Sequence, residues 1–389
     1  MNKNFHPDTI AIHGGQKNQG NKNFPIPDLV LNSAIPLESL EEGWEMLTKE
    51  SIDNFAYQRY ENPTVRILEE KFKEMEGSTY ALAINSGMTA CYLIFRALLT
   101  SGDHILSQHS LYHEISDQII EDKVACGIDY TLIDEYSNGC FERNIQNNTK
   151  VIFVETPTNP TMKDVDLPAL SHICRKHGII LVVDNTLLTH ELQKPLSLGA
   201  HVAVYSTTKT INGHGDAMGG LITTNDNVIY KKIKQLRENT GQVLDPFSAW
   251  LTIRGMRTLR LRLNRHTENA LKVIEFLQAH YPKLEVRYPL HSQNSLQNKV
   301  THGGGVISIV FDNKDMGTEF IRNLKLLKIA TTFGNLESLC YHFGTFTRPH
   351  RDLSKIGLPE GLVRLSIGIE DANDIIHDID QSLKALWTE

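Results

Sequence analysis

The sequence has 389 residues, of which 40% are hydrophobic and 22% charged, proportions that fit a folded globular protein and exclude a disordered chain. Its formal net charge of −7 disfavours a protein that binds nucleic-acid phosphates, because such proteins are usually basic. A chain of this length is typical of two or three domains.

The start of the chain and its cysteines favour the cytoplasm. The first residues, MNKNFHPDTIAIHGG, lack the apolar core of a secretory signal. The longest apolar run, residues 179–183, has the length of a buried strand and is too short for a membrane span. Five scattered cysteines without a CxxC pair favour free packing thiols over disulfides or a zinc site. We expect a cytoplasmic protein without membrane association or bound metal.

The N-terminal 50 residues and the segment after them differ in pattern. The first part is rich in Asn, Pro and Gly without periodicity, so it has no core of its own and is expected to lie against another surface. Between Val65 and Met75 apolar residues recur at helical spacing, which predicts a helix over residues 63–77. Gly77 fits the C-terminal end of that helix.

From Tyr80 to about residue 224, short apolar runs alternate with helical segments. The runs include YALAINS, KVIFVETP, IILVVDNT, HVAVYSTT and GGLITT. Continuous apolar runs separated by helices predict an α/β fold with a mostly parallel sheet that helices cover on both faces. Ligands bind at the carboxyl ends of strands in such sheets, so the residues that follow each run are the candidate site.

After about Phe247 the pattern becomes one long helical stretch, residues 249–280, that carries several arginines. We interpret this charge run as a solvated face or an intersubunit network. The arginines are Arg254, Arg257, Arg260, Arg262 and Arg265. The later runs GGGVISIVF and LVRLSIGIE predict a smaller α+β domain.

The segments after the strands carry residues suited to one cofactor. A turn at Ser86-Gly87-Met88 before a helix offers free backbone amides to a phosphate, although Ser86 as a plain N-cap is an alternative. Lys209 follows an apolar strand between hydroxyls, where desolvation makes a lysine nucleophilic. No GxxxxGK[ST] motif precedes Lys209, which disfavours a nucleotide-binding lysine. A surface lysine is the remaining alternative.

Asp184 ends the strand before that of Lys209 and adds a third role. It is either a turn cap or a carboxylate for a pyridine nitrogen. Pyridoxal 5'-phosphate needs a lysine, a phosphate cup and such a carboxylate. Because Lys209, the Ser86 turn with Ser206 and Thr208, and Asp184 offer all three, the sequence predicts that cofactor.

These motifs resemble the Cys/Met-metabolism PLP-dependent enzymes, the fold-type I group of cystathionine γ-synthase, cystathionine γ-lyase and methionine γ-lyase. The resemblance spans nearly the whole chain. Its motifs are YQRYENPT at 57–64, SGM at 86–88, ETPTNP at 155–160, DNT at 184–186, STTK at 206–209, NGH at 212–214 and GLVRLS at 361–366.

The resemblance implies a role for each matched residue. Lys209 resembles the lysine that holds the cofactor and moves the α- and β-protons, and Asp184 its pyridinium partner. Tyr112 resembles the tyrosine that stacks on the cofactor ring and assists proton transfer. The implied phosphate cup consists of Ser86, Gly87, Met88, Ser206 and Thr208. The implied substrate residues are Arg364, which grips the α-carboxylate, with Asn159 and Thr332.

The resemblance also implies an assembly and a reaction. Tyr57 and Arg59 resemble a pair that reaches the phosphate of a neighbouring subunit, within a homotetramer built as a dimer of dimers. The implied domains are an arm over residues 1–55, a PLP-binding domain over 56–248 and a C-terminal domain over 249–389. The implied activity on a small amino acid is γ-replacement or γ-elimination through a vinylglycine-type intermediate. β-Elimination and a non-catalytic relative of the fold are the alternatives.

Three positions depart from the family pattern. His113 and Glu114 follow Tyr112 where Gly-Gly or Gly-Cys is common. Residues 331–334, Thr-Thr-Phe-Gly, replace Glu-Ser-Leu-Gly and so lack the acid that meets the distal amino group of cystathionine. Residues 346–348, Phe-Thr-Arg, replace Met-Thr-His. These changes are either drift or a changed substrate choice, in which Glu114 supplies an acid to the substrate and Arg348 a base. Phe333 slightly favours β-elimination.

Overall fold

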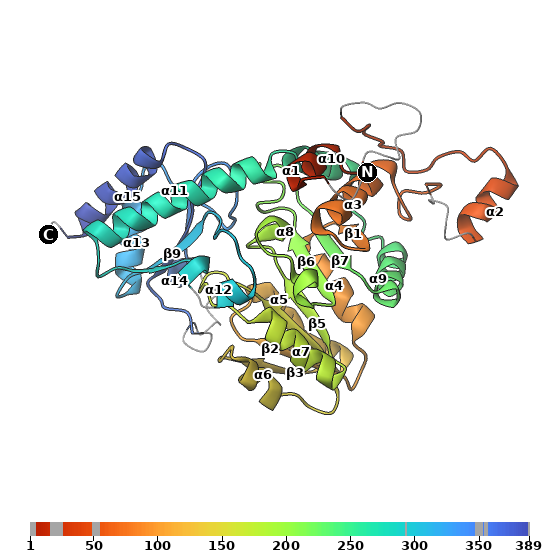
Figure 1. Cartoon of the computed structure of the whole chain (residues 1–389), viewed down its shortest axis with the longest axis horizontal. Coiled ribbons are helices and arrows are strands. Elements are labelled where there is room, and N and C mark those ends of the chain that lie inside the picture. Colours follow the sequence, from red (N-terminus) through yellow and green to blue (C-terminus); the bar gives the residue numbers. More distant parts are fainter. Residues whose placement is uncertain are drawn as a thin grey trace.

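A computed structural model of the chain describes residues 5–15, 26–48, 55–291, 294–346, 353 and 357–387. It contains two sheets that lie apart in the molecule, and the long helix α11 (Leu259–His280) runs from one to the other (Figure 1). The larger sheet and its helices hold most of the chemistry-bearing motifs.

The larger sheet has seven strands in the order β1-β7-β6-β5-β4-β2-β3. Only β7 runs antiparallel to its neighbours, so the predicted, mostly parallel sheet is confirmed. In chain order the strands are β1 (Tyr80–Ile84), β2 (His104–Gln108), β3 (Asp129–Ile133), β4 (Thr149–Glu155), β5 (Ile180–Asp184), β6 (Val202–Ser206) and β7 (Gly220–Thr224).

Helices cover both faces of this sheet because successive strand residues point to opposite sides. In β5, Val182 packs with the helices of one face, and Leu181 and Val183 pack with those of the other. The first face carries α4 (Gly87–Leu98), α5 (His113–Cys126) and α9 (Asn227–Thr240). The second carries α1 (Pro7–His13), α3 (Pro63–Glu76), α6 (Asn138–Arg143), α7 (Leu167–His177) and α10 (Pro246–Met256).

The helix predicted over residues 63–77 is α3. Asn62 caps its start by accepting hydrogen bonds from the amides of Thr64 and Val65. Gly77 ends it with a φ of 81°, a left-handed conformation that favours glycine. Local signals alone therefore set both ends of α3.

The long helical stretch predicted after Phe247 is two helices, α10 and α11, with Arg257 and Thr258 between them. The carbonyl of Gly255 accepts from the amide of Thr258 and from the side chain of Arg262, so it is not available to continue the helix. Arg262 is also only 5% exposed, which makes the solvated-face interpretation wrong for this residue. Its guanidinium donates to the carbonyls of Thr210 and Ile211 and so braces the loop after Lys209.

The smaller sheet has the order β10-β11-β12-β9-β8 and is antiparallel apart from the β10–β11 pair. Its strands are β8 (Glu285–Arg287), β9 (Val306–Val310), β10 (Lys328–Ile329), β11 (Leu339–His342) and β12 (Leu362–Ser366). The helices after α11 are α12 (Asn294–Gln297), α13 (Lys314–Asn323), α14 (Phe343–Phe346) and α15 (Ala372–Leu386). The C-terminal half of α11 packs with α13 and α15 on this sheet, as expected for a smaller α+β unit.

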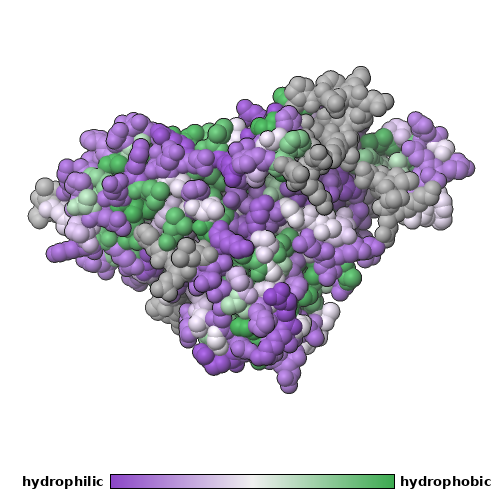
Figure 2. Space-filling view, in the orientation of Figure 1, coloured by the Kyte–Doolittle hydropathy of each residue, from purple (hydrophilic) through white to green (hydrophobic). Residues whose placement is uncertain are grey.

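The N-terminal part includes α2 (Leu40–Thr48), which projects away from the rest of the molecule (Figure 1). Leu40 and Trp44 on this helix are 88% and 68% exposed. The face in Figure 2 is otherwise a mosaic of hydrophilic residues with scattered hydrophobic ones. The five cysteines are free, as predicted. Within the described ranges no helix combines the length and apolar character that a membrane crossing requires.

Short helical turns complete the chain. The helix α8 (Thr189–Leu192) and the 3₁₀ turn at Pro195–Leu198 follow β5, and a second 3₁₀ turn lies at Pro289–His291. The turn at Pro195–Leu198 packs beside the second face of the large sheet through Leu196 and Leu198, and α8 packs against α11 through Leu192.

Candidate active site

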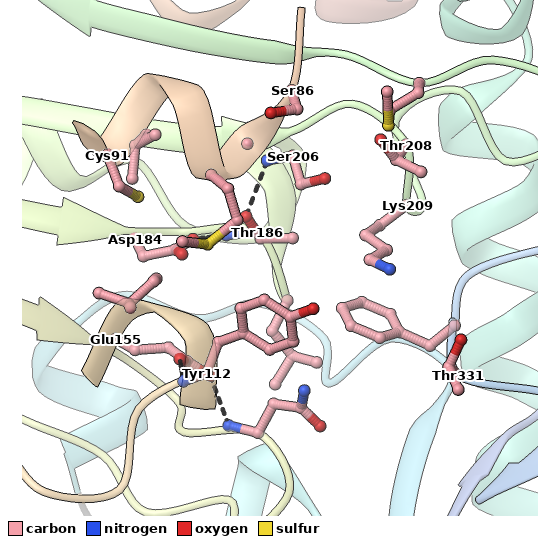
Figure 3. Close-up of a pocket in the computed structure, with 18 of the residues that line it drawn as sticks. Ser86, Cys91, Tyr112, Glu155, Asp184, Thr186, Ser206, Thr208, Lys209 and Thr331 are labelled. Atoms are coloured by element: carbon pink, nitrogen blue, oxygen red, sulfur yellow. Dashed lines mark hydrogen bonds between the residues drawn. The ribbon is translucent and has the colours of Figure 1, made fainter. Parts of the chain in front are cut away.

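A cavity of about 210 Å³ lies at the carboxyl ends of β4, β5 and β6, where the sequence placed the candidate site (Figure 3). The N-terminus of α4 and residues of the smaller sheet close its sides. Predicted residues that line it are Ser86, Gly87, Met88, Tyr112, Asn159, Asp184, Ser206, Thr208, Lys209 and Arg364. The topology thus brings together residues that are far apart in sequence.

Lys209 extends its amine into this cavity (Figure 3). The amine donates a hydrogen bond of 3.1 Å to the hydroxyl of Thr332, which places Thr332 at the site although it is not a lining residue. Burial, with the positive charge of Arg364 as a second cause, lowers the pKa of Lys209 to about 8. A lysine of this kind is partly neutral near physiological pH and is therefore nucleophilic.

Asp184 and Glu155 form a buried pair of carboxylates beneath the cavity. They end neighbouring parallel strands and are partners in the register of β4 and β5. Burial raises the pKa of both, and the charge of Asp184 contributes to raising that of Glu155 to about 8. Glu155 accepts from the amides of Tyr112 and Asn159, each at 2.7 Å, and Asp184 from that of Thr186 at 2.9 Å. A cation bound in the cavity next to this pair would reduce the repulsion between the two carboxylates.

The turn before α4 is shaped for an anion. The amides of Gly87 and Met88 begin the helix, so they have no acceptor within it. A Cβ on Gly87 would lie 2.8 Å from that of Ser206, so only glycine allows this close approach of helix and strand. Ser86 caps the helix by accepting from the amide of Thr89 at 3.0 Å, which is the alternative role noted for it.

Arg364 enters the cavity from β12 of the smaller sheet. Its guanidinium donates to the side-chain oxygen of Asn159 at 3.1 Å and to the carbonyl of Thr332 at 2.8 Å. The rings of Phe333, Tyr341 and Phe343 lie 5.3–5.6 Å from the guanidinium carbon. Burial lowers the pKa of Arg364 to about 10, which leaves it charged at neutral pH. A buried, charged fork of this kind suits a carboxylate.

Tyr112 lies across the cavity from Lys209 and precedes α5 (Figure 3). Glu114, two residues further on, does not line the cavity. Its carboxylate pairs with the imidazole of His113 at 2.7 Å. The prediction that Glu114 contacts the substrate therefore stays a prediction, because Glu114 is not among the residues that line the cavity.

Tyr57 and Arg59 lie outside the cavity of their own chain. Arg59 donates to the carbonyl of Glu238 at 2.5 Å and stacks over the ring of Tyr60, while Tyr57 is 45% exposed. The predicted role of this pair at a neighbouring subunit is consistent with their distance from the cavity, and it remains a proposal.

The cavity also includes residues whose position sequence reasoning missed. Glu155 belongs to a quoted motif, but only the strand register shows that it lies beside Asp184. Lining residues that the sequence did not single out for the site are Ile115, Leu187, Val204 and Met218, with Cys91; Thr186, Thr331 and Phe333 also line it and belong to segments named above. Cys91 was expected to serve packing only, and it is 2% exposed. Arg348, which was predicted to supply a base to the substrate, lies outside the described residues.

The residues present fit pyridoxal phosphate. Lys209 would hold its aldehyde carbon, Asp184 its pyridinium nitrogen, and the α4 turn with Ser206 and Thr208 its phosphate. The carboxylate pair supports this assignment, since a pyridinium would supply the cation that the pair lacks.

Comparisons with known proteins agree with this geometry. The family profile described as "Cys/Met metabolism PLP-dependent enzyme" matches residues 8–384. The chain is 36% identical to an L-methionine gamma-lyase of Fusobacterium nucleatum subsp. polymorphum, over 97% of this chain and 98% of the relative. It is 34% identical to a cystathionine gamma-lyase of Sus scrofa, over 97% and 93%. The crystal structure of metB from Corynebacterium glutamicum has a TM-score of 0.91 and 34% identity, covering 98% of this chain and 99% of that one.

Proposed function

Because the chain belongs to the Cys/Met metabolism PLP-dependent enzyme family, we propose that it catalyses elimination or replacement at the γ-carbon of an amino acid. The substrate class is an O-acylhomoserine, cystathionine or a methionine-like thioether. The observation that carries the proposal is the convergence of Lys209, Asp184 and Arg364 on one cavity.

Each of these residues has its own role in the proposed reaction. When bound, pyridoxal phosphate withdraws electrons from the substrate and so acidifies its α-proton. Arg364, with Asn159 and Thr332, holds the α-carboxylate and thereby orients the α-proton. The neutral amine of Lys209 removes that proton and moves the next one from the β-carbon. A substituent on the γ-carbon then leaves with its bonding electrons.

The product decides between γ-elimination, γ-replacement and β-elimination. The second candidate is β-elimination, which the resemblance supports because Phe333 is aromatic as in the β-lyases; its ring lies 5.5 Å from the Lys209 amine. We would incubate the enzyme with O-acylhomoserine, cystathionine and methionine, each with and without an added thiol. From cystathionine, 2-oxobutyrate indicates γ-elimination and pyruvate with homocysteine indicates β-elimination, while a new thioether formed from O-acylhomoserine and the thiol indicates γ-replacement. A protein that takes up no pyridoxal phosphate and turns over none of these substrates would refute the proposal.

Replacing Arg364 with lysine is expected to lower kcat/KM about 10–100-fold, mainly through KM. Lysine keeps the charge but cannot bond Asn159, Thr332 and a carboxylate at once, and a hydrogen bond to a charged group contributes about 1.5–3 kcal/mol. Steady-state kinetics on the best substrate measure the change. An unchanged KM for that substrate would contradict the role of Arg364 in holding the carboxylate.

Arg59 tests the proposed assembly, a homotetramer with shared sites. We expect Arg59→Ala and Lys209→Ala to be inactive separately, and to regain up to about a quarter of the activity after the subunits are mixed by unfolding and refolding. Activity returns because, in a mixed dimer, one site combines an intact Lys209 with an intact Arg59 from its neighbour. Assays of the refolded mixture measure this, with each variant refolded alone as control. A mixture that stays inactive although mixed dimers form would rule out the sharing.

A further inference from the structure

Arg364 is a buried cation that forms no ion pair within the described part of the chain. It is only 4% exposed. Its hydrogen bonds go to neutral acceptors, the side-chain oxygen of Asn159 and the carbonyl of Thr332, and no carboxylate is among the groups whose charges act on it. Because burial of an unpaired charge is unfavourable, other groups of the fold must stabilise this guanidinium.

Strand pairing brings an aromatic ring to Arg364. In the antiparallel pair of β11 and β12, Tyr341 lies directly opposite Arg364, so both side chains point to the same face of the smaller sheet. Val363, the neighbour of Arg364 along β12, points the other way into the core beneath α11. The register of the sheet therefore fixes the contact between this ring and the guanidinium.

Three rings surround the guanidinium. The ring centroids of Phe333, Tyr341 and Phe343 lie 5.3, 5.6 and 5.6 Å from its carbon, within the range of cation–π contacts. Phe333 lines the cavity and packs with Met162. Tyr341 and Phe343 are not among the lining residues, and their rings meet edge to face with centroids 4.9 Å apart. An effect of these two rings on substrate binding would therefore pass through Arg364.

We propose that Tyr341 and Phe343 are positioning residues that hold the Arg364 guanidinium in place for the carboxylate of an amino acid. The inference rests on the proposed function, since this carboxylate is that of the substrate. Ring faces carry partial negative charge and so stabilise the cation, but they take up none of its N–H groups as a carboxylate would. The N–H groups that Asn159 and Thr332 leave unused therefore stay available for the substrate.

The test compares two ligands of the enzyme loaded with pyridoxal phosphate. One is L-alanine, and the other is ethylamine, which is alanine without its carboxylate. The absorption change of the bound cofactor gives both dissociation constants. In Tyr341→Leu and Phe343→Leu, which remove a ring but keep an apolar side chain, the dissociation constant of alanine is expected to rise about 5-fold. That of ethylamine should stay the same, because ethylamine has no group for Arg364 to bind.

Two kinds of control variant accompany these measurements. Tyr341→Phe and Phe343→Tyr keep a ring and should bind alanine as the natural enzyme does. Phe276→Leu makes the same change from ring to aliphatic side chain on α11, away from the cavity, and should alter neither dissociation constant. A rise that is equal for alanine and ethylamine in the leucine variants would mean a general distortion of the site and would overturn the proposal.

Fluorinated phenylalanines at position 343 separate attraction of the cation from packing. Fluorine withdraws electrons from the face of the ring while changing its size little. If the ring attracts the guanidinium, the affinity for alanine should fall stepwise as fluorines are added. An affinity for alanine that does not respond to fluorination would also overturn the proposal. Because L-alanine has no γ-carbon, these results do not depend on whether the proposed γ-chemistry is correct.

Discussion

Lys209→Ala is expected to reduce kcat by about 10³-fold or more, because one side chain performs both proton transfers and holds the cofactor. Its amine is the nucleophile of the cavity: burial and Arg364 lower its pKa to about 8, and Thr332 orients it from 3.1 Å. Lysine→alanine removes the amine but leaves the carboxylate pair, the α4 turn and Arg364. The variant should therefore still bind pyridoxal phosphate, though without a covalent bond.

Two measurements check this expectation apart from activity. The natural enzyme should be yellow, and borohydride should fix the cofactor on the peptide that contains Lys209. The rate of cofactor uptake by the cofactor-free enzyme should rise with pH and level off above about 8, because only the neutral amine attacks an aldehyde. Lys232→Ala, a change at an exposed lysine of α9, is the control and should alter neither result. Borohydride labelling of another lysine in the natural enzyme would contradict the assignment.

The parts of the site that could be predicted are those set by local sequence. Continuous apolar runs indicate buried parallel strands, and the carboxyl ends of such strands meet at one edge. Asp184, Ser206, Thr208 and Lys209 each follow such a run, so their convergence followed from the pattern. The ends of α3 were equally local, since Asn62 caps amides two and three residues further on and Gly77 adopts a left-handed φ.

The parts that could not be predicted depend on contacts between distant segments. Glu155 and Asp184 face each other only through the register of β4 and β5, which no local pattern encodes. The break between α10 and α11 depends on the Arg262 side chain, which bonds Gly255 and, 51 and 52 residues away, Ile211 and Thr210. A run of arginines in the sequence indicates a solvated face. Only the structure shows that three backbone carbonyls accept from Arg262 and that this arginine is buried.

Asp184→Asn is expected to lower kcat/KM on the order of 10²–10³-fold while the cavity keeps its shape. Asparagine has the size of aspartate but no charge, so the pyridinium nitrogen would lose the anion that keeps it protonated. Loss of one member of a buried charge pair costs about 3–5 kcal/mol, and the lower part of that range corresponds to a fall of this size. The pKa of Glu155 should fall at the same time, since the like charge of Asp184 is one cause that raises it. Kinetics and the absorption spectrum of the bound cofactor measure the effect.

Glu155→Gln is the matched comparison, because it makes the same carboxylate-to-amide change one strand away. Glu155 already accepts from the amides of Tyr112 and Asn159. Asp184 accepts from the amide of Thr186 beside it, which leaves acceptor capacity toward the cavity. The change at Glu155 should therefore disturb Tyr112 and Asn159, and with them KM, but leave the spectrum of the bound cofactor in place. If Glu155→Gln changed that spectrum and Asp184→Asn did not, the pyridinium partner would be Glu155. Because the two carboxylates lie side by side in the register of β4 and β5, comparing these two variants decides which of them is the pyridinium partner.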